Sequence, residues 1–146
     1  NIQINEAKEV IPMIDIQYTI ETEQYGNKTG NRLFIPANIF RKGFTTPDLK
    51  QRVQDIHINY GYLDTDSICL QIPEGYTIES LPKTCQVTSS FGSFSSSLMI
   101  KDKEICIIHR LLMHRGIYPK EIYKDFLEFR KQIAAQYSSK IILKKE

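Results

Sequence analysis

The sequence predicts a mainly β domain: an antiparallel β-sandwich-like fold with one C-terminal amphipathic helix and a final short strand. Three observations predict this class. Apolar and polar side chains alternate with period two in several short runs, as they do in half-buried strands. Turn residues separate these runs at intervals of roughly 8–12 residues, which favours a sandwich or folded sheet over βαβ units. Helical periodicity is confined to one long stretch, at about residues 119–137.

The first quarter of the chain predicts two strands joined by a turn. Residues 1–9 are polar and aperiodic, and they predict no element. Residues 10–22 place isoleucine and tyrosine on one face and polar side chains on the other, which is typical of a half-buried strand. Residues 23–30 predict a turn, because their Asn and Gly residues tolerate a positive φ. A short second strand follows at residues 32–35.

The longest irregular segment spans residues 36–51 and is punctuated by Pro and Gly. It carries Phe40 and Phe44, so we expect it to fold back on the core. Residues 52–60 resume the alternation and predict a further strand, which bends at Gly61.

Five more strands complete the predicted sheets. They span residues 67–72, 76–81, 84–90, 93–100 and 104–113. The serine run inside the fourth of these resembles low complexity, but Phe94, Leu98 and Ile100 keep a period of two through it. We therefore expect a strand with a small-residue outer face. The fifth is apolar on both faces, as expected of a central strand.

The predicted helix begins near Pro119, whose missing N–H is not needed in the first turn. Glu121 and Asp125 follow, where the helix dipole favours negative charge. Apolar side chains recur at spacings of three and four, so the helix should cover one face or end of the sheet. This apolar stripe comprises Ile122, Tyr123, Phe126, Leu127, Phe129, Ile133, Ala134 and Tyr137. Residues 141–143 predict the last strand.

Composition restricts the function classes. Nineteen basic and 17 acidic side chains give a net charge of +2, too balanced for a nucleic-acid or acidic-membrane partner. No apolar run approaches the roughly 20 residues of a membrane span. There is no Gly-rich phosphate loop, and we predict no cofactor. The chain has no signal peptide and begins with Asn1, so we expect residues 1–146 to be one domain excised from a longer chain.

The three cysteines, Cys69, Cys85 and Cys106, lie in apolar strand-like runs. An odd number leaves at least one unpaired within this chain. Buried free thiols are the favoured state, because free cysteine behaves as a small apolar side chain. One disulfide remains open as an alternative, and the sequence does not choose its partners.

Histidines raise the hypothesis of an enzyme that uses Cys106 or His109. Both His109 and His114 lie near the end of the same predicted strand, and side chains five apart on a strand point to opposite faces. Cys106 and His109 diverge in the same way, and His57 is remote in sequence. No Cys-x-x-Cys or His-x-x-x-His spacing is present, so we predict no metal site and no catalytic residue.

Other candidate sites are weaker. Asp64 and Asp66 do not continue into the ligand spacing of a calcium loop, and we expect them to be solvated turn carboxylates. The triplet that begins at Asn27 matches a glycosylation acceptor, a pattern that is common by chance. Tyr60 and Tyr62 are candidate stacking residues for a sugar, against the simpler alternative of aromatic residues on a β edge.

One run is more specific: the strand Leu70-Gln71-Ile72 followed by Pro73-Glu74-Gly75-Tyr76 and then Leu81-Pro82. It resembles the C-terminal domain of unknown function that follows a transglutaminase-like core in large secreted or periplasmic proteins of Gram-negative bacteria. Similar features follow in order from Arg52 onward. They are Phe91-Gly92-Ser93-Phe94, Ile108-His109-Arg110, Pro119-x-x-x-Tyr123-x-x-Phe126 and Ile141 to Leu143.

This resemblance implies a β-sandwich-like accessory domain beside a papain-like core that carries the Cys–His–Asp triad. The chain itself would then be non-catalytic and periplasmic, envelope-associated or secreted. Its partners would be the preceding domains of the same polypeptide, with another protein or a glycan as further partners. The alternative is a free-standing carbohydrate-binding β-sandwich module that uses Tyr60 and Tyr62.

Arg110 is a candidate structural charge. It lies in the apolar strand predicted to be central, where a buried charge needs a carboxylate partner. Glu79 is one candidate for that partner.

Overall fold

The computed structural model describes residues 2–8, 11–23, 25–39, 46–49 and 52–146. Its strands are β1 (Ile2–Ala7), β2 (Met13–Tyr18), β3 (Asn27–Thr29), β4 (Arg32–Pro36), β5 (Ile56–Ile58), β6 (Tyr62–Gln71), β7 (Tyr76–Ser80), β8 (Cys85–Ser89), β9 (Gly92–Lys101), β10 (Glu104–Met113), β11 (Gly116–Tyr118) and β12 (Lys140–Lys145). A 3₁₀ turn, Lys120–Ile122, leads into the helix α1 (Tyr123–Tyr137).

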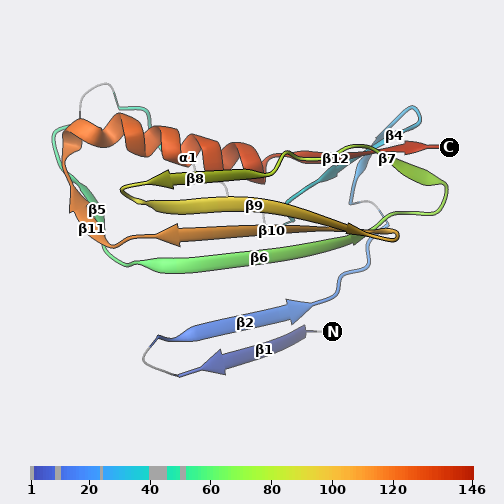
Figure 1. The fold of residues 1–146 in the computed structure, drawn as a ribbon, viewed down its shortest axis with the longest axis horizontal. Coiled ribbons are helices and arrows are strands. Elements are labelled where there is room, and N and C mark those ends of the chain that lie inside the picture. Colours follow the sequence, from blue (N-terminus) through green and yellow to red (C-terminus); the bar gives the residue numbers. More distant parts are fainter. Residues whose placement is uncertain (1, 9–10, 24, 40–45, 50–51) are drawn as a thin grey trace.

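The described residues form two four-stranded sheets, in which neighbouring strands are antiparallel (Figure 1). The main sheet has the order β6-β10-β9-β8, and the second has the order β3-β4-β12-β7. Two smaller pairs, β1-β2 and β11-β5, complete the strands. The predicted class, mainly antiparallel β with one C-terminal helix and a final strand, is therefore confirmed.

The central strand β10 shows why the main sheet has two different faces. Ile105, Ile107, His109 and Leu111 alternate along it, and all four are buried. Ile105 and Ile107 pack in one core cluster with residues of the second sheet, whereas Leu111 packs in another with α1. We call this covered side the inner face. The outer face carries the intervening side chains of β10 and, on β9, Ser93, Ser95 and Ser97, so its small-residue character is as predicted.

The helix α1 begins one turn later than predicted, because residues 120–122 form a 3₁₀ turn after Pro119. The first backbone N–H groups of a helix have no partner within it. Here the Asp55 carboxylate accepts a 3.1 Å hydrogen bond from the N–H of Lys120. The guanidinium of Arg52 lies 4.7 Å from the centre of the Tyr123 ring. Asp55 and Arg52, which both precede β5, therefore anchor the start of the helix.

The apolar stripe of α1 faces the core as expected. Its buried members are Tyr123, Leu127, Phe129, Ile133 and Tyr137. Ile122 and Phe126 are half-buried and pack against the same cluster. No helix among the described residues has the length and apolarity needed to span a membrane.

Two turns are marked by positive backbone angles. Gly30, which was expected to tolerate a positive φ, has a φ of 59° between β3 and β4, and Asp102, between β9 and β10, has a φ of 53°. Gly92 shows a different requirement, since it lies at φ 148° where a Cβ would collide with the Leu112 carbonyl of the neighbouring strand. Glycine at this position lets β9 approach β10 closely.

The prediction was wrong in several places. Residues 2–7 form a strand, although they were expected to be irregular, and β3 lies where a turn was expected. The strand predicted at residues 52–60 is only three residues long. β6 begins at Tyr62, five residues earlier than expected, and β11 was missed.

The structure describes residues 36–39 and 46–49 of the segment predicted to be irregular. Ala37 and Asn38 are fully buried, so its first residues enter the core. Phe40 and Phe44 lie outside the described residues, and their predicted fold-back on the core stays a prediction.

The N-terminal hairpin β1-β2 forms a two-stranded sheet of its own (Figure 1). Its register pairs Ile4 with Ile16 and Ile2 with Tyr18. These residues therefore share one face of the hairpin with Ile14 and its partner Glu6. The opposite face carries the side chains of Gln3, Asn5, Ala7, Met13, Asp15 and Gln17.

Candidate functional site

A row of polar side chains crosses the inner face of the main sheet. Ser96 of β9 lies opposite His109 of β10, and His109 lies opposite Asp66 of β6. On β8, Cys85 lies opposite Ser96. Because directly paired residues point to the same face, these four side chains form one line beneath the helix. From the sequence, His109 was weighed only with His114, His57 and Cys106, because its neighbours in this row come from three other strands.

This polar row is enclosed. His109 is 1% exposed, and its Nδ1 lies 3.5 Å from the buried amide of Asn38. The ring centre of Phe94 lies 5.8 Å from that of His109, and the ring centre of Tyr137 lies 5.1 Å from it. Burial raises the pKa of the Tyr137 hydroxyl, and the nearby Asp66 and Asp64 add to the effect. In this conformation the imidazole is not accessible to a substrate, so the row acts as a polar part of the core.

The other two histidines, His57 and His114, do not lie beside His109. His114 is exposed after the end of β10, where its Nδ1 lies 3.4 Å from the Ser90 carbonyl. His57 belongs to β5, in a different sheet. Cys106 lies on the same strand as His109 but points to the outer face. The structure therefore does not assemble the Cys–His pair considered from the sequence.

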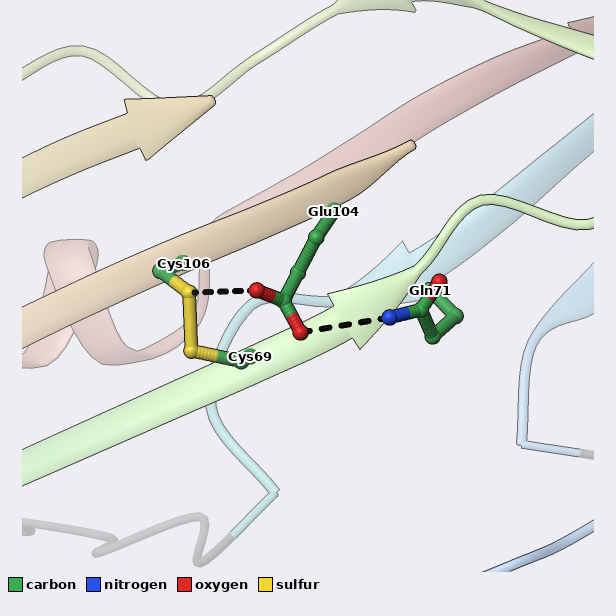
Figure 2. Close-up of a disulfide and its surroundings, with 4 residues drawn as sticks. All are labelled: Cys69, Gln71, Glu104 and Cys106. Atoms are coloured by element: carbon green, nitrogen blue, oxygen red, sulfur yellow. Dashed lines mark hydrogen bonds between the residues drawn. A yellow bond between two sulfur atoms is a disulfide. The ribbon is translucent and has the colours of Figure 1, made fainter. Parts of the chain in front are cut away.

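The outer face carries a disulfide between Cys69 of β6 and Cys106 of β10 (Figure 2). The two residues are directly paired across the sheet, with 4.1 Å between their Cα atoms. The favoured prediction of three free thiols was wrong, and the alternative of one disulfide is what the structure contains. Cys85 is the free cysteine, and burial raises the pKa of its thiol.

Two polar side chains flank this disulfide. One carboxylate oxygen of Glu104 lies 3.7 Å from the Cys106 sulfur, and the other accepts a 3.3 Å hydrogen bond from the Gln71 amide (Figure 2). Glu104 pairs with Gln71 across the strands, next but one to the cysteine pair. Glu104 and the sulfur atoms of Cys69 and Cys106 offer ligand atoms that lie within 4.8 Å of one another.

Arg110 and Glu79 do not form the predicted pair. Arg110 is exposed on the outer face, opposite Thr65 and Ser95, so it is not a buried charge. Its position at the centre of the sheet misled the prediction, because that strand is covered on one face only. Glu79 instead receives two 2.6 Å hydrogen bonds from Arg32. These hydrogen bonds hold the pKa of Glu79 below its ordinary value.

The two candidate sugar-stacking tyrosines lie in different surroundings. Tyr60 is 81% exposed and lines a shallow pocket of about 330 Å³. The other lining residues are His57, Ile58, Asn59, Arg115, Gly116 and Ile117. Tyr62 is 43% exposed and lies beside Arg130 of α1. Of the two tyrosines, Tyr60 lines this pocket and Tyr62 does not.

Asp64 and Asp66 share one face, as their spacing implied. They lie within β6 rather than in a turn, and both are half-buried on the side that faces Tyr137. The prediction of solvated turn carboxylates was therefore wrong, because the strand begins before them.

Comparison with known protein families identifies the family of this chain. A family model described as a domain of unknown function, DUF3858, matches residues 31–143. The chain belongs to this family. The match runs from the turn before β4 to Leu143 of β12, and it leaves the hairpin β1-β2 outside. No curated protein and no solved structure matches the chain. The resemblance to a domain of unknown function is thus confirmed.

Proposed function

We propose that this DUF3858 domain is a non-catalytic accessory domain of a multidomain transglutaminase-like protein, and that it packs on a neighbouring domain through the hairpin β1-β2. The observation that carries the proposal is the apolar face of this hairpin. Ile2, Ile4, Ile14 and Ile16 are each more than half exposed on that face. The hairpin also lies outside the region that the family model matches.

The physical argument is the instability of such a surface in water. An isolated two-stranded hairpin is marginally stable at best, and it gains stability when its apolar face packs against another surface. Contiguous exposed apolar patches commonly mark interaction sites. An apolar surface on a preceding domain would cover the four isoleucines and leave the polar face of the hairpin in water.

Two further observations support the proposal. His109 is enclosed and the sulfur of Cys106 is bonded to Cys69, so the two residues of the enzyme hypothesis drawn from the sequence have structural roles. A disulfide also fits the secreted or periplasmic setting that the family resemblance implies, because disulfides persist in oxidising compartments. Hydrolase or transferase activity in the isolated 146 residues would contradict a non-catalytic role.

The first experiment measures the size of the native protein. An antibody against this domain is used on fractionated cells of its source. We expect a band far larger than 17 kDa, the mass of this chain, in the envelope or secreted fraction. A band near 17 kDa would mean that the domain stands alone, and it would contradict the accessory-domain proposal.

The second experiment tests the hairpin in that longer polypeptide. Ile4→Asp combined with Ile16→Asp puts two charges on the apolar face, whereas Asn5→Asp puts a charge on the opposite face. We expect the double substitution to increase hydrogen exchange in the hairpin and Asn5→Asp to leave it unchanged. Equal exchange in both variants would remove the hairpin as the contact surface.

Carbohydrate binding is a second candidate, because exposed Tyr60 borders the shallow pocket beside Arg115. Aromatic side chains of this kind present a flat apolar surface with a polar tip. A glycan screen tests the candidate, with Tyr60→Ala expected to abolish any hit and Tyr62→Ala expected to leave it. A screen without hits, or hits that survive Tyr60→Ala, would reject it.

A further inference from the structure

The disulfide lies in a setting that keeps its two cysteines together without the S–S bond. Cys69 and Cys106 face each other within a run of ten consecutive residue pairs between β6 and β10. On one side of them Leu70 pairs with Ile105, and on the other Ile68 pairs with Ile107. The backbone of both strands is therefore held on each side of the cysteines. After reduction the two thiols would remain next to each other on the outer face.

Glu104 adds a third donor to this pair. It lies two residues before Cys106 on β10, so both side chains point to the outer face. One of its carboxylate oxygens lies 3.7 Å from the Cys106 sulfur. In the oxidised protein this is a contact between an oxygen and a sulfur without a proton. In the reduced protein the same oxygen is placed to accept the thiol proton or to share a cation with the sulfur.

Gln71 orients that carboxylate. It lies two residues after Cys69 on β6 and directly opposite Glu104. Its amide donates a 3.3 Å hydrogen bond to the Glu104 oxygen that is farther from the sulfur (Figure 2). A hydrogen bond of this kind to a ligating carboxylate is the usual support of a protein metal site. The two cross-strand pairs, Cys69–Cys106 and Gln71–Glu104, thus present two sulfur atoms, one carboxylate oxygen and the amide that orients the carboxylate on one face of the sheet.

We propose that Cys69, Cys106 and Glu104 form a Zn²⁺ site when the disulfide is reduced. Two thiolates and one carboxylate are ligands that zinc accepts in tetrahedral sites, with Zn–S distances of about 2.3 Å and Zn–O distances of about 2.0–2.2 Å. The three donor atoms already lie within 4.8 Å of one another. Cys69 is exposed, so a water molecule can fill the fourth position.

The electrons and protons of the switch balance with a dithiol as reductant. A small or protein dithiol transfers two electrons and two protons to the disulfide and becomes a disulfide itself. Zn²⁺ then displaces the two protons from the Cys69 and Cys106 thiols, and Glu104 binds as the carboxylate that it already is. A disulfide-class oxidant reverses the sequence: it re-forms the S–S bond and releases Zn²⁺.

The position of Met99 makes it possible to distinguish a Zn²⁺ site from a site for a soft monovalent ion. It lies opposite Cys106 on β9, so its thioether is on the same face as the two cysteines. Sulfur-only sites of thiolates and thioethers select soft ions such as Cu⁺. A zinc site depends on Glu104, whereas a soft-ion site would depend on Met99.

The test measures metal binding by the 146-residue chain before and after reduction. Co²⁺ is added as a spectroscopic probe for the thiolate-to-metal charge-transfer band, and Zn²⁺ affinity is measured by competition with a chromophoric chelator. We expect the reduced chain to bind one Zn²⁺ and the oxidised chain to show no band. Far-ultraviolet circular dichroism reports whether the reduced chain keeps its sheets. A reduced chain that unfolds, or that binds no Zn²⁺, would overturn the proposal.

Matched variants identify the ligands. Glu104→Gln is expected to weaken zinc binding about tenfold or more, and Glu128→Gln to leave it unchanged. Glu128 is a suitable control because it also accepts a side-chain amide hydrogen bond, from Gln132 at 3.0 Å, on an exposed part of the chain. Cys85→Ala should retain the band. Binding that survives Glu104→Gln but is lost in Met99→Ala would overturn the zinc assignment in favour of a soft ion.

Discussion

The inner and outer faces of the main sheet each bring reactive or metal-binding side chains together, but the two groups differ in their exposure to solvent. On the inner face Ser96, His109 and Asp66 line up across three strands beneath the helix. On the outer face Cys69, Cys106 and Glu104 gather within 4.8 Å. His109 is enclosed by aromatic rings, whereas Cys69 is exposed.

The difference shows that residue types do not identify a site without their exposure. The Ser–His–Asp row has the composition of a nucleophile, a base and an acid, yet α1 and Asn38 cover it. Buried polar side chains make the packing of a core specific when they are hydrogen-bonded, and the Nδ1 atom of His109 lies 3.5 Å from the Asn38 amide. The sulfur–carboxylate group lacks any recognisable sequence motif. Its access to solvent is through exposed Cys69, since Glu104 is half-buried and Cys106 is only 6% exposed.

The largest expected effect separates the two faces on a single strand. Leu111 is 0% exposed on the inner face, and its neighbour Leu112 is 37% exposed on the outer face. Leu111→Ala should lower the free energy of unfolding by about 2–5 kcal/mol, because it removes buried methyl groups and leaves a cavity. Leu112→Ala should cost less than about 1 kcal/mol. Urea denaturation measures both, and equal losses would refute the assignment of the faces.

Reduction of the disulfide should have the next largest effect. The cysteines are 37 residues apart, and loop-closure entropy for this separation corresponds to a loss of up to about 4 kcal/mol on reduction. The urea midpoint of the wild-type chain should therefore fall when a dithiol is added. The double variant Cys69→Ser, Cys106→Ser is the control, because its midpoint should not respond to the dithiol. An unchanged wild-type midpoint would mean that the bond does not stabilise the outer face.

A smaller effect is expected where the helix that covers the inner face begins. Asp55→Ala removes the acceptor for the Lys120 N–H and should lower the free energy of unfolding by about 0.5–2 kcal/mol. Asp55→Asn keeps an oxygen in the same place and should lose less. Thermal or urea denaturation compares the two variants, and an equal loss would show that the negative charge, not the hydrogen bond, stabilises the helix start.

The smallest effect concerns the exposed pair Arg32–Glu79 on the second sheet. Its hydrogen bonds lower the pKa of Glu79 from the ordinary value of 4.5, so the pair stabilises the folded chain above that pH. The contribution is lost as the pH falls through the lowered folded-state pKa. A carboxyl-detected NMR titration should find the Glu79 pKa below the ordinary value and find it returned by Arg32→Gln. No change in this variant would contradict the pairing.

Local pattern was sufficient for much of the fold. The alternation through Phe94 and Leu98 identified β9 despite its serine run, and the continuous apolar run identified β10 as central. The strand at residues 2–7 was missed because its polar side chains hide the alternation of Ile2 and Ile4. Pairing with β2 makes it a strand, and strand propensity depends on such context more than helix propensity does.

The candidate sites were less predictable, because each depends on strand order. Cys69 and Cys106 become neighbours only when β6 pairs with β10, and no spacing rule selects cysteines 37 residues apart. Arg110 was expected to be buried because β10 is central, but its side chain lies on the face that the helix does not cover and is exposed. The sequence contains no signal for which face the helix covers.

The position of β12 in the second sheet has a consequence for synthesis. Ile35 of β4 pairs with Ile141 of β12, more than one hundred residues later in the chain. At a translation rate of roughly 5–20 residues per second, β4 waits on the order of 5–20 seconds for its partner. During this interval the unpaired edge of β4 is open to other nascent chains. A pause in translation between β4 and β12 would therefore increase aggregation without altering any contact of the finished domain.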